Sequence, residues 1–100
     1  MHSLRPGKLA RGLLLFAILL GGCASAPYQQ MSDARQAVEA ARPVVADQPD
    51  ERAQLQEARE MLARAEEHLR AGEYEHARRL AEKARDMAIA ARRAVEEGAE

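Results

Sequence analysis

The sequence predicts an all-α protein: an antiparallel helical hairpin with an additional N-terminal helix, forming a small two- to three-helix bundle. A signal peptide and a short tether are predicted to precede it. Between residues 32 and 97 the good helix formers Ala, Arg, Glu, Leu and Gln dominate, whereas β-branched and aromatic residues are scarce. Small and large apolar residues recur there at helical spacing. A chain of 100 residues allows one small domain at most.

Residues 1–22 are predicted to be a signal peptide for export. Arg5, Lys8 and Arg11, with no acid among them, precede an unbroken apolar run from Leu13 to Leu20, and small residues follow. That order is typical of a secretory signal. A membrane-spanning helix needs about 20 apolar residues, so this run is too short for one. A buried N-terminal helix of a cytosolic protein is the alternative, and the cationic start argues against it.

The single cysteine ends this segment. Leu20-Gly21-Gly22-Cys23 resembles the lipobox of bacterial lipoproteins. The resemblance implies cleavage between Gly22 and Cys23, diacylation of the Cys23 sulfur and acylation of the new amino terminus. More than one acyl chain gives stable membrane anchoring. Residue 24 is Ala. An Asp at this position would resemble an inner-membrane retention signal, so the absence of Asp implies passage to the outer membrane. We therefore expect a lipid anchor on the periplasmic face of the outer membrane.

A lipidated tether is predicted over 23–31 and a helical domain over 32–97, with helices at about 32–45, 49–71 and 73–97. Ser32 is predicted to be the N-cap of the first helix. Pro43 either kinks this helix or ends it near Arg42, because proline cannot donate the helical hydrogen bond. Pro49 is tolerated only in the first turn of the second helix.

Gly72 is predicted to end the second helix as a left-handed cap, and Gly98 to close the third. The short link at Gly72 makes these two helices antiparallel. Their apolar stripes consist of Leu55, Ala58, Leu62, Ala65 and Leu69, and of Ala77, Ala81, Ala84, Ala88, Ala91 and Val95. Alanine buries little area, so the core is thin. We therefore expect self-association or an envelope protein partner.

The third helix carries three arginines at a spacing of seven, Arg78, Arg85 and Arg92. Folding about Gly72 would set Arg78 near Glu66 and Arg85 near Glu60. The stripe could instead dock peptidoglycan carboxylates or an acidic partner, but pairing within the chain is the preferred interpretation. The formal net charge is −1 and the acids lie in the helical body, which argues against nucleic acid as a partner.

His68 and His76 flank the predicted turn with acids nearby, and a metal site is one interpretation of them. Two solvated histidines are the preferred interpretation, because the pair lacks the i, i+4 spacing and a cysteine ligand. No metal and no other cofactor are therefore expected. Ser25 and Ser32 have no histidine near in sequence and the helices offer no deep pocket, so we expect no enzymatic activity.

The stretch from Ala58 to Ala84, AREMLARAEEHLRAGEYEHARRLAEKA, resembles the hairpin of short bacterial lipoproteins grouped as domain of unknown function 4398. These proteins share a lipobox and an Ala-rich first helix, and the resemblance spans about residues 20–95. The resemblance adds no activity, because none is assigned to the family. The turn at Gly72 and the helix after it also look like part of a tetratricopeptide repeat, but the sequence holds no second copy of such a repeat. We expect a structural or adaptor module of the cell envelope, or alternatively a self-assembling lipoprotein or a peptidoglycan-associated spacer.

Overall fold

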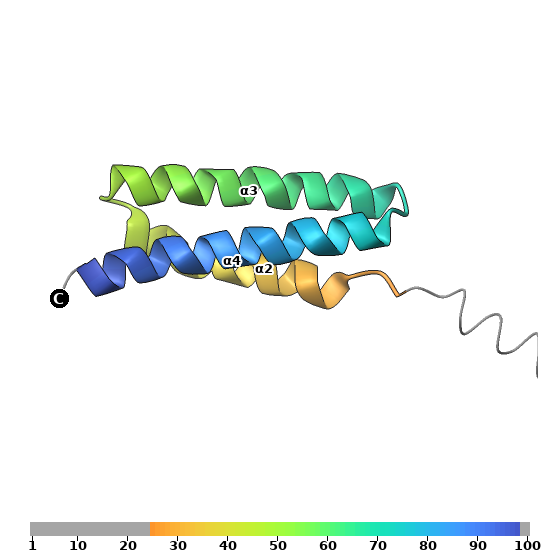
Figure 1. Cartoon of the computed structure of the whole chain (residues 1–100), viewed down its shortest axis with the longest axis horizontal. Coiled ribbons are helices and arrows are strands. Elements are labelled where there is room, and N and C mark those ends of the chain that lie inside the picture. Colours follow the sequence, from red (N-terminus) through yellow and green to blue (C-terminus); the bar gives the residue numbers. More distant parts are fainter. Residues whose placement is uncertain (1–24, 99–100) are drawn as a thin grey trace, which may run out of the picture.

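The chain folds into helices that lie side by side along one axis. The computed structural model describes residues 25–98 and contains, within them, α2 (Tyr28–Val45), α3 (Pro49–Arg70) and α4 (Tyr74–Gly98). Helix α3 runs antiparallel to α2 and α4 (Figure 1). The predicted all-α bundle is confirmed. The signal peptide over 1–22, the cleavage site at Gly22 and the lipidation site at Cys23 lie outside the described residues, so these stay predictions.

Helix α2 begins one turn earlier than the sequence analysis expected, and the assignment of Ser32 as its N-cap is wrong. The Met31 N–H donates to the Pro27 carbonyl at 3.0 Å, which makes Pro27 the cap residue. The Ser32 hydroxyl instead accepts a bond from the Gln36 side chain. Met31 is fully buried. Because Met31 continues the apolar face of α2 toward the N-terminus, the helix takes in residues that had been assigned to the tether.

Pro43 lies inside α2 and does not end it near Arg42. The helix continues to Val45, whose side chain is 1% exposed. Proline removes one backbone donor, which would have served the Glu39 carbonyl. Pro43 is exposed and sits close to the helix end, so its ring does not disturb the core. Burial of Val45 offsets the lost hydrogen bond.

Gly72 forms the predicted left-handed cap, with φ at +79°. The Gly72 N–H donates to the Leu69 carbonyl at 3.1 Å, and the Glu73 N–H donates to the His68 carbonyl at 2.9 Å. This pair of bonds is the Schellman arrangement that satisfies the last carbonyls of a helix. Helix α4 starts immediately afterwards, so the turn fixes α3 and α4 as antiparallel neighbours.

The core is an alanine seam on α4 faced by larger side chains. Every buried residue of helix α4 is an alanine. These alanines, all with no exposed area, are Ala77, Ala81, Ala84, Ala88 and Ala91. Helices α2 and α3 supply Met31, Val38, Val45, Leu55 and Leu62. Small side chains let α4 approach both neighbours closely. None of the described helices combines the length and the apolar character that a membrane crossing requires.

Candidate functional site

The arginine stripe of α4 does not pair across the hairpin as predicted. Arg78 forms an ion pair with Glu75 at 2.7 Å and donates to the Ser25 carbonyl at 3.4 Å. Arg92 pairs with Glu96, one turn further along the same helix. Carboxylates three or four residues away on α4 are simply nearer than those on α3. Within residues 25–98 the exposed Arg85 forms no ion pair, whereas Arg78 and Arg92 each pair with a carboxylate of α4.

The expected contact of Arg78 with Glu66 is wrong because Glu66 faces α2 as well. Its carboxylate lies 3.5 Å from Arg35 Nη2 and 4.0 Å from Arg70 Nη2. The two arginine side chains are mostly exposed and the Glu66 side chain is 33% exposed, and such surface pairs contribute only about 0–1 kcal/mol. Glu66 therefore helps to set α2 against α3, but it marks no binding site.

A groove with three arginines lies where α2 gives way to α3. Its volume is about 250 Å³. The lining residues are Arg42, Val45, Ala46, Arg52, Leu55, Gln56 and Arg59. Carboxylates are absent from this lining, whereas Val45 and Leu55 give it an apolar floor. Guanidinium groups bind carboxylates through paired hydrogen bonds, so the groove suits an acidic side chain beside an apolar one.

Two of these arginines already make contacts inside the chain. Arg52 Nη1 donates to the Ala46 carbonyl at 3.2 Å, and Arg42 Nη1 lies 3.4 Å from Glu39 Oε2. The bond from Arg52 holds its guanidinium beside the link between α2 and α3. Sequence analysis missed this groove. The only signal was the seven-residue spacing of Arg52 and Arg59, which repeats one face of α3.

The groove and the N-terminal end of the described chain lie at opposite ends of the bundle (Figure 1). Ser25 sits beside the Gly72 turn, because its carbonyl accepts the bond from Arg78. Val45, in the groove, closes the other end of α2. At 1.5 Å per residue, the 18 residues of α2 span about 25 Å. The groove and Ser25 are therefore separated by about the length of α2.

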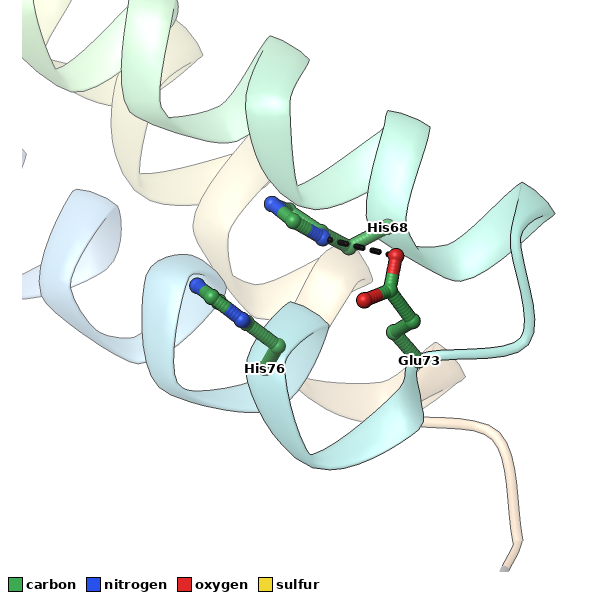
Figure 2. Close-up of side chains that lie close together, drawn as sticks. All are labelled: His68, Glu73 and His76. Atoms are coloured by element: carbon green, nitrogen blue, oxygen red, sulfur yellow. Dashed lines mark hydrogen bonds and ion pairs between the residues drawn. The ribbon is translucent and has the colours of Figure 1, made fainter.

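A second cluster lies at the Gly72 turn, where the structure brings His68, Glu73 and His76 together (Figure 2). The two imidazole rings stack, with centroids 4.0 Å apart and planes 7° from parallel. His68 Nδ1 lies 3.2 Å from Glu73 Oε1. His68 is half-buried and His76 is exposed, so both rings reach solvent, and their stacking is a contact that the sequence analysis did not predict. Sequence spacing could not show this contact, because it depends on how the Schellman turn rotates α4 against α3.

Comparison with known proteins identifies the family of the chain. The family model described as domain of unknown function, DUF4398, matches residues 29–100, which include all of α3 and α4 and nearly all of α2. No curated protein and no solved structure gives a significant match. The matched range covers well over half of the chain. The chain therefore belongs to the DUF4398 family, as its hairpin sequence predicted.

Proposed function

We propose that this chain is a lipid-anchored adaptor of the bacterial cell envelope. Its helical domain would stand on the periplasmic face of the outer membrane, held by acyl chains on Cys23, and would have no enzymatic activity. The observation that carries the proposal is the groove around Arg42, Arg52 and Arg59, which no carboxylate lines and which lies at the far end of the bundle from Ser25. Its occupant would be an acidic segment of another envelope protein.

The position of the groove supports an adaptor role. Ser25 follows Cys23 by two residues, so lipidation there would keep the Gly72 end of the bundle near the bilayer. The rigid α2 would then carry the groove about 25 Å further out. A partner that could not reach the membrane surface would meet the protein at this distal end.

The surface favours recognition by charge over self-association through an apolar face. Among residues 25–98, only one large apolar side chain is mostly exposed: that of Tyr28, with 69% of its area accessible to solvent. Stable homo-oligomers usually bury a larger and more apolar surface. The groove instead combines three guanidinium groups with a small apolar floor, and an acidic peptide with an apolar residue would complement both.

Photo-crosslinking in cells tests this proposal. A photoreactive amino acid would replace Gln56, an exposed groove residue, in the full-length lipoprotein. We expect one covalent adduct with an envelope protein, mapped to an acidic segment of that protein. Arg59→Glu should abolish the adduct, because it places a carboxylate in the groove. The matched variant Arg64→Glu, also on α3 but outside the groove, should leave the adduct intact.

Each other outcome has a defined meaning. An adduct that survives Arg59→Glu would refute the groove as the binding site. An adduct with a second copy of the chain would favour a self-assembling lipoprotein. An adduct with muropeptides would favour a peptidoglycan-associated spacer, whose carboxylates could occupy the same arginines.

A further inference from the structure

We propose that His68, Glu73 and His76 bind one divalent transition-metal ion, which is Zn²⁺ in the cell, with Cu²⁺ and Ni²⁺ as competitors. Two imidazole nitrogens and one carboxylate are a ligand set that zinc sites use. The potential ligand atoms of the three residues all lie within 4.8 Å of one another. The site stands at the Gly72 turn, away from the arginine groove, and does not depend on the proposed adaptor function.

The backbone at this turn is already fixed by hydrogen bonds. The Glu73 N–H donates to the His68 carbonyl, and the Ala77 N–H donates to the Glu73 carbonyl at 3.0 Å. His68 therefore belongs to the last turn of α3, Glu73 precedes α4, and His76 lies in the first turn of α4 (Figure 2). All three ligand side chains project from backbone that is already ordered. Metal binding therefore needs only side-chain movement, and little conformational entropy is lost.

The required movement is small. Ligand atoms at about 2.1 Å from a tetrahedral metal lie about 3.4 Å from one another. His68 Nδ1 and Glu73 Oε1 already meet this spacing at 3.2 Å. The ring of His76 must approach by up to about 1.4 Å, the difference between 4.8 Å and the tetrahedral spacing, and turn out of the parallel stack, so that its in-plane lone pair points at the ion. His76 is exposed, which leaves its side chain free to turn.

The charge and the exposure of the site define what it would bind. One carboxylate and two neutral imidazoles leave a divalent ion with one positive charge and at least one position open to water. Nitrogen ligands select zinc, nickel and copper over magnesium and calcium, which prefer oxygen. The negative end of α3 and the positive end of α4 meet here, so the two helix dipoles largely offset each other. An open position could be filled by water or by a ligand from a partner.

Bound metal would clamp the hairpin. His68 belongs to α3 and His76 to α4, so the ion would link the two helices across the Gly72 turn. A metal that binds the folded chain raises the folding equilibrium constant, by about 100-fold when its concentration is about 100 times its Kd. The thermal midpoint of the helical signal should therefore rise with added zinc.

Calorimetric titration of the full chain with zinc chloride tests the site. The protein would be purified in detergent without a histidine tag, and every sample would carry Cys23→Ala so that no thiol competes. We expect one zinc per chain at this site. His76→Gln should weaken that binding by at least about tenfold, since even groups that only support a metal ligand contribute this much. Glu82→Gln, an exposed carboxylate elsewhere on α4, should change nothing.

Nuclear magnetic resonance spectra of the protein with His68, Glu73 and His76 all present test the site without relying on the folding of a variant. Zinc should shift the imidazole resonances of His68 and His76 together, at one equivalent, and leave those of His2 unchanged. Glu73→Gln should keep the helical circular dichroism signal and lose the zinc-dependent rise in thermal midpoint. Zinc binding that is equally tight in His76→Gln, or zinc addition that leaves both resonances unmoved, would overturn the proposal.

Discussion

Single residues divide into those whose role follows from backbone chemistry and those whose role depends on neighbours. Gly72 belongs to the first group: a glycine at the end of an apolar helical stripe predicts a left-handed cap, and its φ of +79° confirms this. Ser32 and Arg78 belong to the second. A buried Met31 extended the helix past Ser32, and Glu75 competed for Arg78. Local sequence does not show which partner a polar side chain will find.

Replacing Gly72 by alanine should destabilise the bundle by backbone strain alone. A Cβ at Gly72 would meet no atom within 4 Å, so no clash adds to the cost of the positive φ. That cost is about 1–2 kcal/mol. Gly98→Ala is the matched control, because its Cβ also meets open space and its φ is not positive. Chemical denaturation of residues 24–100 should show a loss for Gly72→Ala and almost none for Gly98→Ala; equal midpoints would contradict the strained cap.

Helices were predictable where a repeating pattern governs them. The stripes of α3 and α4 follow one helical face for many residues, so the bounds expected for them agree with the structure to within one residue. Helix α2 was less well predicted at its start, because Pro27 reads locally as part of a loop. Its end at Val45 came from burial of that side chain, which outweighed the proline two residues earlier.

Enlarging one alanine of the α4 seam should force the helices apart. Ala88 has no exposed area, and its Cβ contacts the core between α2 and α3. Ala88→Leu should cost about 1–3 kcal/mol, as overpacking of a close-packed site does. Ala90→Leu adds the same atoms on the exposed side of the same helix and should change stability by less than about 0.5 kcal/mol.

Thermal melting followed by circular dichroism checks this pair. The midpoint of Ala88→Leu should fall by several degrees, whereas that of Ala90→Leu should stay near the parent value. If both variants melted alike, α4 would not pack through its alanine stripe, and the arrangement of the three helices would need revision.

At the scale of the whole molecule, the order of the helices was predictable but their relative placement was not. A short link at Gly72 leaves only an antiparallel hairpin, and the bundle follows once α2 packs on it. The arginine groove combines the end of α2 with the start of α3, and the histidine cluster combines the end of α3 with the start of α4. Both sites arise from rotations of one helix against another, which spacing within one helix does not encode.

The proposed adaptor role depends on attachment at Cys23, and intact-mass spectrometry of the chain extracted from bacterial membranes measures that attachment. We predict a polypeptide that starts at Cys23 and carries acyl chains, recovered from the outer-membrane fraction. Cys23→Ala should accumulate as an unlipidated precursor that retains residues 1–22. A native chain recovered from the soluble periplasmic extract, with a free thiol and no acyl mass, would contradict the lipid anchor and with it the proposed placement of the arginine groove.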